Sequence, residues 1–219
     1  CGANPSCRAE YPRLEEDWAR LAREYAAARP LTIAHPRTGL SQTQDVDFLA
    51  IDGALRTLLY SAEYSALVPE LITRGAAGDL APLFAASLRL VGDLGQGMNI
   101  GLQLSVVCAE DGQRVDARDR DLVRASPVAA TVLARVDAAC ADWPHGAVPA
   151  TFHDPTTSDR PVLAFSGGLD PVTPAANGEL ALRTLARATH IVAPGYGHLV
   201  SPFGCAPRLV ARFVDDGNA

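Results

Sequence analysis

Two apolar segments in the last third of the sequence are each followed by a residue that can take part in proton transfer. The run Arg160–Phe165 precedes a glycine-containing turn that ends at Asp170, and the run His190–Ala193 precedes a glycine-rich loop that ends at His198. Short apolar runs bounded by glycine and proline indicate buried parallel strands. Because open α/β sheets place their chemistry at the carboxyl ends of such strands, we expect Asp170 and His198 to lie together.

An acid followed by a histidine matches the last two members of a Ser…Asp…His triad. Asp170 would accept a hydrogen bond from the imidazole and hold its tautomer, and His198 would take the proton of a serine hydroxyl. We expect the Thr173 hydroxyl to donate to Asp170 and steady it. The alternative for Asp170 is a helix cap, because Asp-Pro often begins a helix. No G-x-S-x-G motif occurs in the 219 residues, so the usual setting of the nucleophile is missing.

Nothing in the sequence predicts a metal or an organic cofactor. The cysteine and histidine spacings match no zinc-binding pattern. Four histidines occur in connectors, beside a proline or at a strand start, where a surface or structural role is expected: His35, His145, His153 and His190.

The overall charge and hydropathy exclude some classes of partner. A net charge of −6 without a basic cluster argues against nucleic acid or an anionic membrane as partner. No apolar run reaches the roughly 18 residues that span a bilayer. The sequence begins at Cys1 without an initiator methionine or a signal peptide, so we expect it to be part of a longer polypeptide.

Five cysteines favour an oxidising compartment outside the cytoplasm. Cys1 and Cys7 are close enough in sequence for a small disulfide. Cys108, Cys140 and Cys205 would supply a second disulfide and leave one thiol. The alternative is that all five are ordinary buried thiols.

The pattern of elements divides the chain into a mostly helical part, residues 1–101, and a part with strands and helices, residues 102–219. The run Leu102–Cys108 predicts a further strand, with Glu110 just beyond its end. A carboxylate in that place is suited to bind the ammonium group of a substrate by a charge-assisted hydrogen bond. The alternative is a solvated acid in a turn.

Several motifs resemble those of a known family. They are Cys1-x5-Cys7, Ser105–Asp111, Gly167–Pro174, and Gly195–His198 with Gly204-Cys205. Together they resemble the exported α/β-hydrolases related to tripeptidyl aminopeptidase and proline iminopeptidase, over nearly the whole chain.

This resemblance implies a partial α/β-hydrolase fold, in which a helical cap (residues 1–101) is followed by the last parallel strands and helices of the core (residues 102–219). It implies that Asp170 is the triad acid, His198 the base and Glu110 an anchor for the free amino end of a peptide. It also implies that Cys205 is bridged to Cys140 or Cys108.

The implied function is that of the C-terminal part of a secreted, periplasmic or cell-envelope serine aminopeptidase. The serine would lie in a missing N-terminal half, so this chain alone would be inactive. An open sheet edge would allow a homo-oligomer. Two alternatives are an esterase or amide hydrolase of small molecules, and a non-catalytic binding module built on the same fold.

Overall fold

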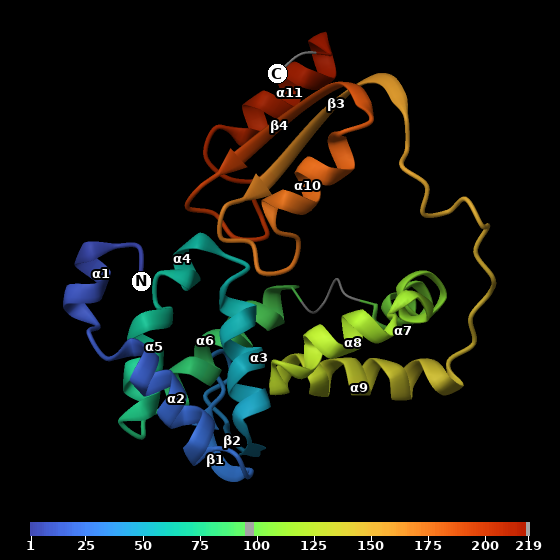
Figure 1. Ribbon diagram of the computed structural model, residues 1–219. Coiled ribbons are helices and arrows are strands. Elements are labelled where there is room, and N and C mark those ends of the chain that lie inside the picture. The colour runs from blue at the N-terminus through green and yellow to red at the C-terminus, as the bar shows by residue number, and fades with distance from the viewer. Residues whose placement is uncertain (95–98, 218–219) are drawn as a thin grey trace. The chain divides into compact units, whose positions relative to one another are not determined.

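The structure, a computed structural model, describes residues 1–94 and 99–217, which form two compact units (Figure 1). The first unit combines Cys1–Val91 with Pro155–Ala219, and the second is Gly92–Asp154. The predicted division into a helical cap, residues 1–101, and a part of the catalytic core, residues 102–219, stays a prediction.

The N-terminal region of the first unit is mostly helical, with one antiparallel hairpin. Its elements are α1 Pro5–Glu10, α2 Leu14–Glu24, β1 Arg29–Ala34, β2 Ser41–Val46, α3 Phe48–Leu58, α4 Ala62–Ser65, α5 Val68–Ala76 and α6 Ala81–Leu94. The hairpin pairs β1 with β2. The strongly amphipathic helix α2 packs against α5, so its apolar stripe faces the core. The fully buried side chains of this region include Leu21, Ile51, Leu58, Leu80 and Leu83.

The second unit is helical throughout its regular elements. It contains α7 Ile100–Val106, a π-helical turn η1 Val107–Asp111, a 3₁₀ turn η2 Gly112–Arg114, α8 Ala117–Arg124 and α9 Pro127–Asp142. The strand predicted over Leu102–Cys108 is therefore wrong. Asn99 caps a helix there, because its side-chain oxygen accepts a hydrogen bond from the Leu102 N–H at 3.0 Å. This local cap outweighs the β-propensity of the valines that follow.

The C-terminal region of the first unit is a strand–helix–strand unit with a closing helix. Its elements are β3 Ser158–Gly167, α10 Ala175–Leu182, β4 Leu185–Ala193 and α11 Ala206–Asp216. The two strands are parallel, with Phe165 opposite Ile191, as the apolar runs predict. Helix α10 covers one face of the sheet (Figure 1). Phe165 and Ile191 point to the other face, where they line a small cavity with Leu209 of α11.

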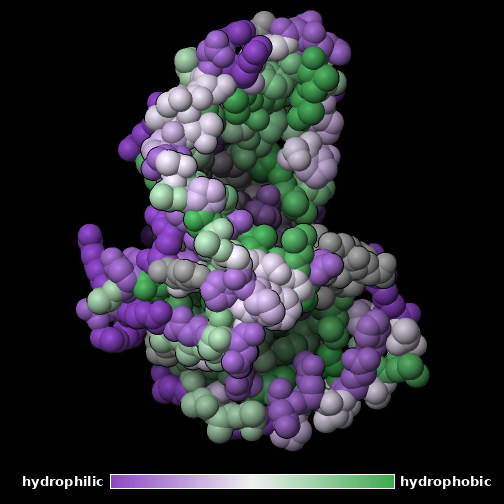
Figure 2. All heavy atoms as spheres, turned by 90° about the vertical axis from the view of Figure 1, so that its right-hand side faces the viewer, coloured by the Kyte–Doolittle hydropathy of each residue, from purple (hydrophilic) through white to green (hydrophobic). Residues whose placement is uncertain are grey.

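Both units leave large apolar side chains in contact with solvent. Leu180 is 62% exposed in the first unit, and Leu102 is 64% exposed in the second. Figure 2 shows apolar areas interspersed with hydrophilic ones on one face of the molecule. Among residues 1–94 and 99–217, no helix has the length and apolar character that a transmembrane helix requires.

Candidate active site

The turn after β3 and the loop after β4 are joined by backbone hydrogen bonds. The Gly168 N–H donates to the Ala193 carbonyl at 2.8 Å, and the Leu169 N–H donates to the Tyr196 carbonyl at 2.9 Å. The two segments approach so closely that a Cβ atom at Gly167 would overlap the Gly197 carbonyl oxygen. The glycine in this turn is thus required by the close approach of the second loop.

These contacts bring Asp170 and His198 together, as predicted. The Nδ1 atom of His198 lies 2.9 Å from Oδ2 and 3.2 Å from Oδ1 of Asp170. Because a carboxylate can only accept, Nδ1 carries the proton and donates it, which leaves Nε2 as the basic nitrogen. The Asp170 side chain is 3% exposed and that of His198 is 30% exposed. The acid is therefore shielded while the imidazole is accessible, which is the arrangement that a triad requires.

Asp170 is held as a carboxylate by hydrogen bonds from its own turn. Burial disfavours its charged form and by itself raises the pKa. The N–H groups of Thr173 and Val172 donate to Oδ1 at 3.0 and 2.8 Å, and Nδ1 of His198 donates to Oδ2. These hydrogen bonds outweigh burial, so the pKa of Asp170 lies below its usual value. The helix cap that the sequence left as an alternative for Asp170 is wrong, because α10 begins after Pro174 and receives no side-chain capping hydrogen bond.

Thr173 lies where the sequence predicts it. Its hydroxyl donates to Oδ2 of Asp170 at 2.9 Å and lies 3.3 Å from Nδ1 of His198. The Thr173 hydroxyl and Nδ1 of His198 thus both donate to Oδ2 of Asp170, and the hydroxyl helps to fix the position of that oxygen.

A second histidine contact was not predicted. Nε2 of His190 lies 2.8 Å from the Ser166 hydroxyl, on the sheet face that α10 covers. A Cβ atom at Gly178 of α10 would lie 3.0 Å from both groups, so the glycine leaves room for them. Since Ser166 is buried beneath the helix, we interpret this pair as a link between adjacent strands. The only signal in the sequence for this link is that Ser166 and His190 occupy positions on neighbouring strands that face the same side of the sheet.

Glu110 lies in the second unit, in the π-helical turn η1, and is half-buried. It does not follow a strand, so that part of the prediction is wrong. Asp170 and His198 belong to the first unit, and the role of Glu110 as an amine anchor remains a prediction.

Two disulfides are present, Cys1–Cys7 and Cys108–Cys140. The implied bridge from Cys205 to Cys108 or Cys140 is wrong, because these two are bonded to each other and Cys205 is a free, exposed thiol. The disulfides are compatible with a secreted protein.

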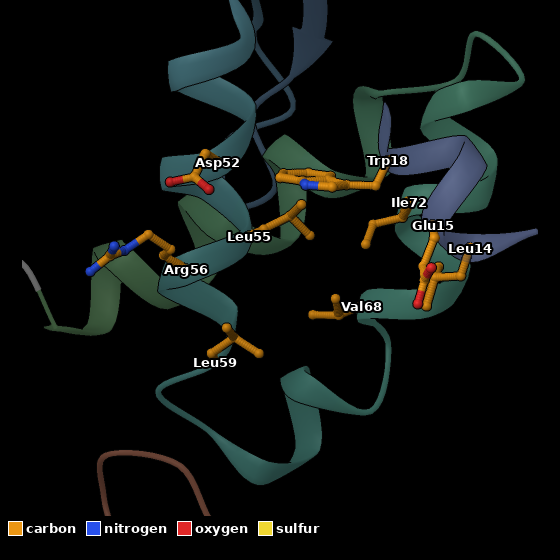
Figure 3. A pocket seen from close by; sticks show the side chains of 9 residues that line it. All are labelled: Leu14, Glu15, Trp18, Asp52, Leu55, Arg56, Leu59, Val68 and Ile72. Carbon is orange, nitrogen blue, oxygen red and sulfur yellow. The ribbon is translucent and has the colours of Figure 1, made fainter. Parts of the chain in front are cut away.

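An apolar pocket of about 370 Å³ lies among α2, α3 and α5 of the first unit (Figure 3). Trp18, Leu55 and Ile72 point into it, and neither Asp170 nor His198 lines it. At its edge, burial raises the pKa of Asp52, and the positive charge of Arg56 partly offsets this. Among the residues that the structure describes, no group of three or more metal-binding side chains occurs.

Comparison with known families gives a match to the part of the chain that contains Asp170 and His198. Residues 126–219 match a family model described as TAP-like protein, which is a family of α/β-hydrolases. Comparisons with curated proteins and with solved structures found no significant match. The match is narrower than the resemblance of the motifs, since Cys1–Cys7 and Ser105–Asp111 lie outside it. It contains β3, α10, β4 and both members of the Asp170–His198 pair, and it supports an α/β-hydrolase family member.

Proposed function

We propose that this chain supplies the acid and the base of a serine hydrolase of the aminopeptidase type. The observation that carries the proposal is the Nδ1–Oδ2 distance of 2.9 Å between His198 and a shielded Asp170. A histidine oriented by a buried carboxylate, with its second nitrogen accessible, is suited to activate a hydroxyl nucleophile. A non-catalytic module would not need this alignment, so the geometry favours the hydrolase.

In the proposed reaction a serine attacks the carbonyl carbon of a peptide bond. Nε2 of His198 takes the serine proton and passes it to the leaving amine, and Asp170 stabilises the imidazolium that forms in between. Water then attacks the acyl-enzyme in the reverse sequence of proton transfers, which releases the acid product and the serine. No metal or organic cofactor takes part in this scheme.

The nucleophile in this proposal comes from a polypeptide segment outside the 219 residues, because the chain has no G-x-S-x-G motif. The two-stranded sheet supports this, since β3 and β4 pair only with each other among the described strands. A parallel sheet normally has more strands and is covered on both faces. Further core strands beside this pair would extend the sheet to the size an α/β-hydrolase needs. In their absence, a second copy of the chain is the alternative occupant of the open edge.

The substrate we propose is a peptide with a free amino end, bound with the help of the Glu110 carboxylate. The two disulfides support an exocytoplasmic location, where such bonds persist.

The test is hydrolysis by the complete product of the gene that encodes this chain, beside its His198→Ala variant. The substrates are peptide anilides with a free amine, the same anilides after N-acetylation, and a short-chain aryl ester. We expect cleavage of the free-amine anilides, with loss of activity in the variant and on acetylation. Glu110→Gln should raise KM for the free-amine substrates, whereas the neighbouring Asp111→Asn serves as a matched control and should not.

Three results would contradict parts of the proposal. Activity on the ester alone would indicate a small-molecule esterase. Equal cleavage of acetylated and free-amine anilides would exclude the aminopeptidase type. Absence of any His198-dependent hydrolysis would leave the binding module as the better interpretation.

A further inference from the structure

The turn that follows α3 lies directly against the histidine loop. The ring of Tyr60 lies 5.1 Å from the imidazole of His198, centroid to centroid, with an angle of 72° between the planes. This is the edge-to-face geometry that aromatic rings prefer, at about 4.5–7 Å. Gly197 is buried at the same contact, and a Cβ atom there would overlap the carbonyl oxygen of Leu59. Two separate contacts therefore join this turn to the loop that carries the base.

The turn has a fixed backbone. The Tyr60 N–H donates to the Thr57 carbonyl at 3.2 Å, and the Ser61 N–H donates to the Leu58 carbonyl at 3.3 Å. Leu58 is fully buried, so this end of α3 is anchored in the core of the N-terminal region. On the other side, Ser61 caps α4 by accepting from the Tyr64 N–H. The Tyr60 ring is thus presented from a backbone held at both ends.

The hydrogen bond to Asp170 leaves one freedom of the imidazole open. The bond fixes Nδ1, but the terminal torsion of a histidine side chain is broad, and the ring can still tilt about that point. Such a tilt moves Nε2, the nitrogen that must face the serine hydroxyl. A neighbouring ring on the flank of the imidazole blocks the tilt on that side.

We propose that Tyr60 is a positioning residue, which fixes the orientation of the His198 ring while Asp170 fixes its Nδ1 atom. The effect on catalysis rests on the proposed function, but the effect on ring orientation does not. Because Tyr60 acts through its ring, phenylalanine at this position should preserve the orientation of His198, whereas leucine should not.

The first experiment is NMR spectroscopy of the 219-residue chain, which needs no nucleophile. We expect nuclear Overhauser contacts between the Tyr60 and His198 ring protons, and a ring-current shift of the His198 signals. Tyr60→Leu should abolish the shift and broaden the imidazole signals, while Tyr60→Phe should preserve both. Tyr64→Leu, which alters a tyrosine on α4 that is not part of this ring pair, is the matched control. Unchanged amide signals of Val172 and Thr173 would show that the acid turn remains folded.

The second experiment measures hydrolysis by the complete gene product. A misplaced base lowers turnover rather than binding, so Tyr60→Leu should reduce kcat by roughly 10- to 100-fold with little change in KM. Tyr60→Phe should stay within about twofold of the unaltered protein.

Different failures have different meanings. Absence of the ring–ring contact, or His198 signals unchanged in Tyr60→Leu, would overturn the positioning role whatever the activity. A changed ring orientation with unchanged kcat would overturn its catalytic importance. If no His198-dependent hydrolysis occurs at all, the proposed function fails, and the NMR comparison alone decides whether Tyr60 orients the ring.

Discussion

The second unit should depend on its disulfide for folding. Among the residues of this unit whose burial the structure describes, only Cys108 is buried, so there is almost no apolar core. Besides the Cys108–Cys140 bond, the contacts between its helices include an Arg120–Asp137 ion pair whose side chains are both 39% exposed. An ion pair with that exposure contributes little to stability, because solvent screens the two charges. The perturbation we consider is therefore the double substitution Cys108→Ser and Cys140→Ser.

The magnitude follows from the length of the closed loop. The two cysteines are 32 residues apart. In the chain-entropy treatment, a disulfide over such a separation stabilises the folded state by about 3.7 kcal/mol. Its loss would shift the equilibrium between the folded and unfolded unit roughly 500-fold, since about 1.4 kcal/mol corresponds to a factor of ten. A helical unit whose described residues include a single buried one has no reserve of that size, so we expect it to unfold.

The assay is far-ultraviolet circular dichroism combined with amide hydrogen exchange. Loss of the bond should reduce the helical signal and remove protection in α9, the longest helix of the unit. The control is the double substitution Cys1→Ser and Cys7→Ser, because α1 contains no buried residue and its loss should leave α9 protected. Full helical signal and native protection in α9 after removal of the Cys108–Cys140 bond would refute this reasoning.

Three further predictions concern the turn that carries the acid. Gly167→Ala should destabilise the first unit by about 2–4 kcal/mol in urea unfolding, because the new methyl overlaps the Gly197 carbonyl; a change below about 0.5 kcal/mol would show that the loops are not in contact. Because the pKa of Asp170 is lowered on folding, its charge stabilises the fold above the ordinary carboxyl value, and this contribution is lost as pH falls through the lowered value. Unfolding at pH 7 and near pH 3 should therefore show a larger cost of Asp170→Asn at the higher pH, and an equal cost at both would contradict this. Thr173→Val should raise the pKa of Asp170 towards its usual value in a carboxyl ¹³C NMR titration, whereas Thr173→Ser should not.

The acid–base pair could be predicted because its determinants are local. Each strand is short and apolar, and each is followed at once by the residue that matters, so the sheet rules place Asp170 beside His198. The role of Thr173 follows from the same turn. The cap by Asp47 on α3 and the cap by Ser61 on α4 are likewise local signals, since each side chain accepts from an N–H three residues later.

Other features depend on information that a single sequence does not carry in its pattern. The valine-rich run before Cys108 suits a strand or a buried helix equally well, and only the cap at Asn99 decides between them. Strand β2, Ser41–Val46, is polar and almost wholly exposed, so it gives no alternating apolar signal. The contact of Tyr60 with His198 joins distant parts of the sequence, and no local pattern predicts it.

The hydrogen bonds that Asp170 accepts come from its own turn and from His198, within a single strand–helix–strand segment. The ring that flanks His198 comes instead from Tyr60, in a separate stretch of the polypeptide. The acid–base pair and the ring that flanks it thus belong to different parts of the chain, which recombination can separate. Recombination that joined this segment to another helical region would carry the acid over intact, together with its bond to the imidazole. It would replace Tyr60, so a new residue would have to orient the imidazole of His198.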